Sequence, residues 1–257
     1  MKKRITLLFG LSLAVGLMFT SCEKDEETTP NQEEKVLYPT KITEYEDGVY
    51  DGEITFEYNA DKKLVKVVYD SDFYETYAYD TDGKVIEYKE FYNNSLDVQE
   101  SMEYNTNGQL IKIQRYNNGI EGGWYSYEYD NQGNVSKRSE HLTDGTVYTY
   151  RTYEYDINGN LINRKYFWED YVTGTILTDT YDETTYEYDD KNNIYKNLNL
   201  PFKYETYINN VTKEVYTETS DDYTYTGIYT YTYNEDNYPI EYTEDDDERY
   251  VIEYQEL

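Results

Sequence analysis

The 257-residue chain carries 53 acidic against 23 basic side chains, which gives a formal net charge of −30. Nucleic acids and anionic membrane surfaces are therefore disfavoured as partners, because like charges repel. Few aliphatic residues together with so high a charge are typical of disordered chains, but 37 tyrosines supply large rings that can be buried while their hydroxyls stay hydrated. The composition predicts a folded protein with a thin core.

Residues 1–21 have the features of an export signal. A basic start is followed by an apolar run that is too short for a comfortable membrane span, and small residues precede Cys22. The end of the segment, Phe19-Thr20-Ser21-Cys22, resembles the lipobox of bacterial lipoproteins, which implies that Cys22 is acylated. As the only cysteine of the chain, Cys22 has no partner for an intrachain disulfide. The alternative is a secretory signal that is simply cleaved.

The residues after the cysteine are polar and show no periodicity. Residues 23–27 (Glu-Lys-Asp-Glu-Glu) resemble the acidic tag that places lipoproteins of Bacteroidota on the outer face of the outer membrane. The alternative is that these residues are only a charged, solvated tether and carry no localisation signal. We therefore predict an acylated Cys22 and a flexible acidic tether over residues 22–37. A lipid-anchored protein on the outer membrane, facing the cell exterior, follows from this prediction.

A short unit recurs from about residue 56 onward. Its best copies read Tyr-x-Tyr-Asp-x-x-Gly, and the Tyr-x-Tyr stretch alternates with Glu or Thr in the period of a β-strand. The Asp or Asn, two turn residues and Gly match a type I turn closed by a left-handed residue. Each unit is therefore predicted to be a β-hairpin. The copies begin at Phe56, Tyr77, Met102, Tyr127, Tyr153, Tyr186 and, in degraded form, Tyr231.

The turn residues carry specific expectations. We predict positive φ at the four unit glycines, Gly83, Gly108, Gly133 and Gly159, and the same conformation at Lys63 or Asn192 in two units that lack glycine.

The hairpins and the segments around them define the fold class. Further strands are expected at Thr40–Glu46, Lys203–Ile208, Lys213–Thr219 and Tyr250–Gln255. The result is an all-β protein, a long antiparallel meander of about 14–18 strands built from repeated hairpins. The meander forms a single domain over residues 38–257 and either curls into a barrel or stays an open single sheet.

The connections fall at two ends of such a meander. One end carries the regular Asp-x-x-Gly turns, and the other carries irregular loops, which on a rigid scaffold usually hold binding sites. Sugar rings stack on flat aromatic side chains, so the aromatic residues of the irregular end are candidates for ligand binding. The candidates are Trp124, Tyr125, Phe167, Trp168 and Tyr171. The alternative is that these rings only seal the end of the sheet.

The units resemble the YD repeats of the RHS and teneurin shells. Over nearly all of residues 40–257 they resemble more closely a family of Bacteroidota surface lipoproteins of unknown function with a porin-like fold. The resemblance implies a large antiparallel sheet curled towards a barrel, and it implies no activity. A barrel inserted in the bilayer is not expected, because the strands that begin at Leu110 and Leu161 carry charge on both faces.

No catalytic signature is present in the sequence. Cys22 is assigned to lipid and His141 is expected to be a surface histidine, so neither a Ser-His-Asp nor a Cys-His device is predicted. Asp80-x-Asp82-Gly83 echoes a calcium loop but fits a hairpin turn better, because a strand follows the glycine at once. A glycosidase needs two carboxylates at a suitable distance, but among 53 acidic residues many pairs would meet this condition by chance, so it does not indicate a glycosidase here. We predict no enzyme, no metal and no cofactor.

The favoured function is a surface-anchored lipoprotein that acts as a non-catalytic binding module for a glycan or another cell-envelope component. A structural or interaction protein of the envelope, which pairs with a partner protein, is the main alternative. A glycoside hydrolase and a calcium-binding protein are weaker alternatives.

Overall fold

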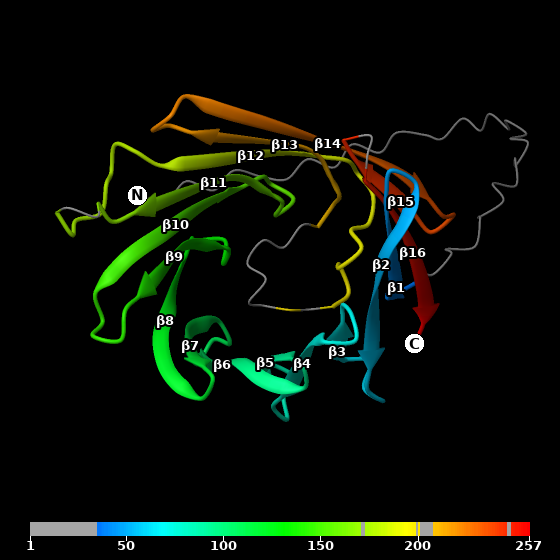
Figure 1. Ribbon diagram of the computed structural model, residues 1–257, viewed down its shortest axis with the longest axis horizontal. Helices are drawn as coiled ribbons and strands as arrows, with labels where there is room; N and C mark the ends of the chain where they lie inside the picture. The colour runs from blue at the N-terminus through cyan, green and yellow to red at the C-terminus, as the bar shows by residue number, and fades with distance from the viewer. Residues whose placement is uncertain (1–34, 171–172, 199, 201–207, 246–247) are drawn as a thin grey trace, which may run out of the picture. The chain divides into compact units, whose positions relative to one another are not determined.

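The computed structural model describes residues 35–257 except 171–172, 199, 201–207 and 246–247. Lys35–Leu257 form one compact unit of sixteen antiparallel strands joined in chain order, and the first strand pairs with the last to close a barrel (Figure 1). The predicted all-β meander is confirmed, and the sheet is closed. The predicted signal and most of the tether lie outside the described residues, which contain no helix long and apolar enough to cross a membrane.

The strands follow one another around the barrel. They are β1 (Leu37–Glu46), β2 (Val49–Tyr58), β3 (Leu64–Val68), β4 (Phe73–Tyr79), β5 (Val85–Tyr92), β6 (Ser95–Tyr104), β7 (Leu110–Asn117) and β8 (Ile120–Tyr129) in the first half. The second half contains β9 (Val135–His141), β10 (Val147–Tyr155), β11 (Leu161–Trp168), β12 (Asp182–Tyr188), β13 (Val211–Glu218), β14 (Tyr223–Tyr233), β15 (Pro239–Glu244) and β16 (Glu248–Glu256).

The regular turns have the predicted conformation. The Asp80 carboxylate accepts the backbone N–H groups of Asp82 and Lys84, at 3.0 and 2.8 Å. Gly83, Gly108, Gly133 and Gly159 have φ values of 87°, 84°, 92° and 89°, so their predicted positive φ is confirmed.

The first unit corrects one expectation about the turns. Lys62, with φ of 62°, takes the left-handed position that was assigned to Lys63, because Lys62 is the third residue after Asn59, as Gly83 is after Asp80. The side chain of Asn59 accepts the backbone N–H of Lys63 at 3.0 Å, as the side chain of Asp80 does in the next unit.

The unit that begins at Tyr186 is not a hairpin, which corrects the prediction for it and for Asn192. β12 ends at Tyr188 and β13 starts only at Val211, while the Asp189 carboxylate accepts the backbone N–H of Asn210 at 3.1 Å. The predicted strand over Lys203–Ile208 falls almost wholly outside the described residues. Residues 189–198 and 200 form an inner segment that runs inside the ring of strands, drawn in yellow in Figure 1.

The inner segment helps to fill the barrel. Its Ile194, Leu198 and Leu200 are each 6% exposed and pack in one cluster with inward residues of β1 to β8 and β16. Residues that follow the regular turns, such as Leu64 and Leu110, belong to the same cluster, so the apolar core lies at the turn end. A sixteen-stranded barrel is too wide for the side chains of its own strands to fill. The inner segment, which stands in place of a hairpin turn after β12, supplies part of the missing volume.

The second tyrosine of most units connects neighbouring hairpins. Its hydroxyl donates to the backbone carbonyl of the first residue after the preceding turn, where a β-bulge interrupts the ladder and leaves a carbonyl to be satisfied. These bonds include Tyr79 to Leu64 at 2.6 Å, Tyr104 to Val85 at 2.6 Å and Tyr129 to Leu110 at 2.7 Å. Tyr254 on β16, which lies outside the units, bonds to the Pro239 carbonyl in the same way at 2.8 Å. The repeated tyrosine is therefore both a core ring and a clamp between hairpins.

The outer face of the barrel is charged. Lysines on the strands form ion pairs with glutamates of the same or the neighbouring strand, including Lys112 with Glu103 and Lys137 with Glu128. These pairs are half exposed and stabilise the fold little.

The inner face away from the turn end is polar. Glu75 lies opposite Glu90, and its carboxylate accepts hydrogen bonds from the hydroxyls of Tyr69 and Tyr77. Glu100 on β6 is 13% exposed at its side chain and lies 3.8 Å from Arg115. Burial raises the pKa of Glu100 to about 7, which outweighs the lowering effect of Arg115.

We expect Tyr104→Phe to lower the free energy of unfolding by about 1 kcal/mol, because it removes the bond to the Val85 carbonyl and keeps the ring. Urea denaturation measures the change. Tyr50→Phe is the control, since the Tyr50 ring is 58% exposed. Equal stability of the Tyr104→Phe protein and the wild type would mean that the clamp contributes nothing.

We expect Glu100 to make stability fall as pH rises from about 4.5 to about 7. In this window the folded state holds a proton on Glu100 that the unfolded state, with a pKa near 4.5, has released. Glu100→Gln should therefore flatten the pH dependence and exceed the wild type in stability at pH 8, by an amount on the order of a few kcal/mol at about 1.4 kcal/mol per pKa unit. Denaturation midpoints between pH 5 and 8 test this, with the exposed Glu103→Gln as control.

Candidate functional site

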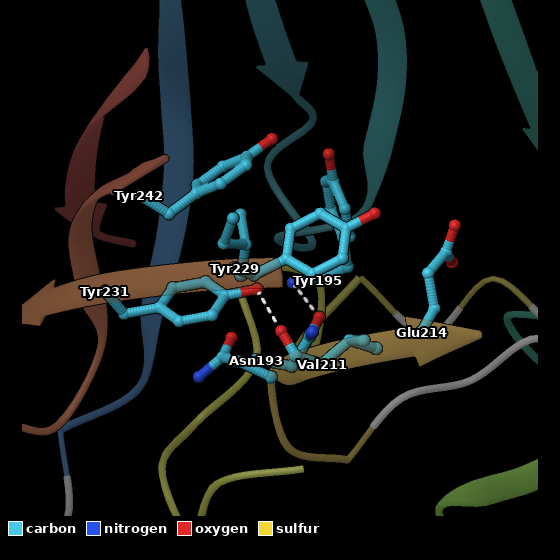
Figure 2. Close-up of a pocket in the computed structure, with 9 residues that line it drawn as sticks. Asn193, Tyr195, Val211, Glu214, Tyr229, Tyr231 and Tyr242 are labelled. Carbon is cyan, nitrogen blue, oxygen red and sulfur yellow. Dashed lines mark hydrogen bonds between the residues drawn. The ribbon is translucent and has the colours of Figure 1, made fainter. Parts of the chain in front are cut away.

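A pocket of about 170 Å³ opens on the inner face where β13, β14 and β15 meet the inner segment. Four tyrosine rings, a carboxylate and two amides surround it, as Figure 2 shows. The lining residues are Asn193, Ile194, Tyr195, Asn210, Val211, Glu214, Tyr229, Tyr231 and Tyr242.

Strand periodicity places the tyrosines of the pocket wall. Tyr229 and Tyr231 are two residues apart on β14 and so share its inner face, and Tyr242 lies opposite Tyr231 on β15. The rings of Tyr231 and Tyr242 have centroids 5.6 Å apart. Glu214 on β13 lies opposite Gly227, where a Cβ would come within 3.3 Å of the Glu214 Cγ. The glycine therefore leaves room for the carboxylate.

The inner segment supplies the other wall. Tyr195 is 40% exposed, and its backbone N–H donates to the Asn193 side chain at 2.9 Å. Asn210 is 1% exposed, and its amide nitrogen donates to the Asn192 carbonyl at 3.0 Å. Its side-chain oxygen has no hydrogen-bond partner among the described residues. A buried acceptor without a partner is costly, so a ligand donor at this wall would relieve the cost.

The pocket tyrosines are neutral hydrogen-bonding groups. Burial raises the pKa of Tyr229, Tyr231 and Tyr242 above the ordinary value, and Glu214 adds to the effect at Tyr229. Tyr229 donates to Glu244 and Tyr231 to the Val211 carbonyl, at 3.0 and 2.7 Å. The Tyr242 hydroxyl forms no hydrogen bond within the described part of the chain. The site thus offers ring faces, a free phenol and a carboxylate acceptor, and no phenolate nucleophile.

The aromatic residues predicted from the sequence lie on two different faces. Trp124 and Phe167 point outward, and each stacks on a neighbour: Trp124 on His141 with centroids 3.5 Å apart, and Phe167 on Tyr150 at 4.6 Å.

Two of the other predicted residues point inward, to the same face as the pocket. Tyr125 lies under the guanidinium of Arg138 at 4.6 Å, and Trp168 lies opposite Thr149 on β10. Tyr171 is outside the described residues. The four described rings do not form one platform, and their role in ligand binding stays a prediction.

His141 corrects another expectation, because it is buried, with 9% exposure. Its Nε2 lies 2.8 Å from the Ser126 hydroxyl, and its Nδ1 lies 3.2 Å from the Gly145 carbonyl. The carbonyl can only accept, so Nδ1 carries the proton and Nε2 accepts from Ser126. A backbone carbonyl stands where a catalytic triad has a carboxylate, and Trp124 covers the ring. Within the described ranges no three His, Cys, Asp or Glu residues are grouped to hold a metal ion.

Sequence reasoning missed the pocket because it placed binding in the irregular loops. One signal was present: the spacing between successive units lengthens to 33 residues from Tyr153 to Tyr186 and to 45 from there to Tyr231. The extra residues include the inner segment, and the degraded last unit supplies Tyr231. A break in a regular repeat therefore indicated the site.

Comparisons with known proteins show the fold. No family model matches the chain, and no curated protein is similar to it in sequence. A solved porin-like protein from Bacteroides uniformis is similar in structure with a TM-score of 0.52 at 13% identity, covering 84% of this chain and 96% of that one. A porin-like protein from Bacteroides vulgatus is similar with a TM-score of 0.50 at 14% identity, covering 86% of this chain and all of the other. This chain therefore has a porin-like barrel fold.

Proposed function

We propose that the chain is a lipid-anchored envelope protein whose barrel binds a carbohydrate in its lumen without a chemical step. The observation that carries the proposal is the pocket walled by Tyr195, Tyr229, Tyr231 and Tyr242. Flat rings accept the C–H faces of a sugar, while phenols and carboxylates bind its hydroxyls. The envelope location rests on the export signal, the lipobox and the porin-like neighbours.

A binding role accounts for the filled lumen better than conduction does. The inner segment packs against β1 to β8 and β16 at the turn end, so it occupies part of the lumen there. The pocket is lined by this segment, and among the described residues it offers two groups without a hydrogen-bond partner, the amide oxygen of Asn210 and the hydroxyl of Tyr242. Groups of this kind prepare a site for a ligand that both donates and accepts.

The anchor is tested by fractionation of cells. We expect Cys22→Ala to move the protein from the membrane to the soluble fraction, because the mutation removes the acylated sulfur. Alanines at residues 23–27 should leave the protein in the membrane but protect it from protease added to whole cells. A Cys22→Ala protein that still sediments with membranes would refute the anchor.

The ligand class is tested on a glycan array with the protein lacking residues 1–21. We expect retained glycans to bind Tyr242→Phe roughly fivefold more weakly, since loss of one hydrogen bond costs about 1 kcal/mol. The ring and its stack on Tyr250, with centroids 4.4 Å apart, persist in this variant. Tyr74→Phe on the outer face is the matched control, because that ring also stacks on a neighbour. If no glycan is retained, or if both variants bind like the wild type, the proposed site is wrong.

A further inference from the structure

Side-chain amides connect the inner segment and the chain that follows it to the barrel wall. The amide nitrogen of Asn192 donates to the Asp236 carbonyl in the turn between β14 and β15, at 3.0 Å. The amide nitrogen of Asn197 donates to the Leu37 carbonyl at the start of β1, at 2.8 Å. A further connection starts from the wall itself, at Asn160 in the turn between β10 and β11. This last connection bears on the pocket.

Asn160 holds the return segment, which comprises residues 208–210 and leads into β13. The side-chain oxygen of Asn160 accepts the backbone N–H groups of Ile208 and Asn209, at 3.1 and 3.0 Å. Its amide nitrogen donates to the Asn209 side-chain oxygen at 3.0 Å and to Asp156 at 3.2 Å. Asn160 is 1% exposed, so water cannot readily replace these bonds. Loss of the side chain would leave two backbone N–H groups without their acceptor.

The return segment connects Asn160 to the pocket. The carbonyl groups of Ile208 and Asn209 accept the backbone and side-chain N–H groups of Asn193, both at 3.3 Å. Asn193 lines the pocket, as Figure 2 shows, and Asn210 at the end of the return segment lines it too. Asn160 is not among the lining residues. It therefore holds the backbone on which two wall amides depend without itself facing the pocket.

The same turn position in other units shows what the turn alone requires. Asn134 occupies it in the unit that begins at Tyr127, and its amide nitrogen donates to the turn aspartate at 3.2 Å, as that of Asn160 does. Lys84 and Gln109 occupy it in two other units, so the turn does not need asparagine. No hydrogen bond joins Asn134 to the return segment within the described residues. The extra bonds of Asn160 thus serve the return segment rather than the turn.

We propose that Asn160 is a positioning residue for the pocket, because its buried amide fixes the return segment and, through it, the wall amides of Asn193 and Asn210. The proposal rests on the carbohydrate-binding function above and adds a residue outside the site that sets its geometry. β12 ends at Tyr188 and β13 begins at Val211, so no strand ladder holds the chain between them. Asn160 supplies a fixed acceptor in place of that ladder. Binding groups that are fixed beforehand lose less entropy when a ligand binds, so Asn160 raises affinity without touching the ligand.

Amide hydrogen exchange tests the positioning role. We expect Asn160→Ala to speed exchange at the backbone amides of Asn193 and Asn210 about tenfold, because local opening of the wall becomes easier when the holding bonds are lost. Asn134→Ala is the matched control, since it removes the same bond within a turn and none to the return segment. It should leave both amides unchanged. The Asp80 amide, which is hydrogen-bonded in the turn between β4 and β5, reports on the rest of the barrel and should keep its rate in both variants.

Asn209→Ala is a second variant in case Asn160→Ala does not fold. Asn209 lies outside the turn, and its side chain bonds to Asn160 at 3.0 Å and to the Lys191 carbonyl at 2.8 Å. This variant should speed exchange at the same two wall amides. The proposal is overturned if Asn160→Ala speeds exchange only at Ile208 and Asn209, which lose their acceptor directly. It is also overturned if exchange rises equally at Asp80, because the change would then be a general loss of stability.

The glycan array separates this proposal from the function on which it rests. Glycans that the wild type retains should bind Asn160→Ala about tenfold more weakly, since the wall is no longer fixed before binding, and should bind Asn134→Ala as before. Unchanged retention by Asn160→Ala would overturn the positioning role even if exchange at the wall is faster. If the wild type retains no glycan, the carbohydrate function is wrong, and the exchange rates alone decide whether Asn160 positions the wall.

Discussion

A closed sheet of sixteen strands encloses more space than the side chains of its inner face can fill, and the rest of this structure depends on that constraint. Aliphatic residues are too few to pack such a lumen, so large tyrosine rings line it and the inner segment occupies its turn end. The inner segment enters the lumen after β12, where the unit that begins at Tyr186 does not form a hairpin. The pocket forms where Tyr195 of this segment meets the wall of β14 and β15, so the site is a by-product of how the barrel is filled.

Tyrosine solves two problems at once in this chain. Its ring supplies apolar surface in a sequence of high charge, and its hydroxyl satisfies backbone carbonyls that the bulges leave without a ladder partner, as Tyr104 does for Val85. Phenylalanine would serve only the first purpose. The Tyr-x-Tyr pattern therefore persists from unit to unit. The last unit keeps the two tyrosines but changes their partners: its first tyrosine, Tyr231, bonds to the Val211 carbonyl, and its second, Tyr233, bonds to the Asp189 carboxylate.

Much of the fold was predictable because its determinants are local. The positive φ of Gly83 and the strand period of the tyrosines follow from residues adjacent in sequence. Counting alternate residues back from Tyr127 would also have placed Tyr125 inside and Trp124 outside, but the bulge after Leu161 breaks such a count before Phe167 and Trp168. The pocket was not predictable in this way. Tyr195, Glu214 and Tyr242 meet only because a long connection returns into the lumen, and no local pattern specifies that path.

The two kinds of basic side chain are divided between the two faces of the barrel. Outward lysines pair with glutamates and keep the outer face hydrated, a task for which a flexible ammonium is sufficient. On the inner face, the guanidinium groups of Arg138 and Arg151 lie over the rings of Tyr125 and Tyr166, at 4.6 and 4.7 Å. A planar guanidinium stacks on an aromatic ring, whereas an ammonium is a compact and strongly hydrated charge. The tyrosines that line the barrel therefore suit arginine on the inner face, while the hydrated outer face suits lysine.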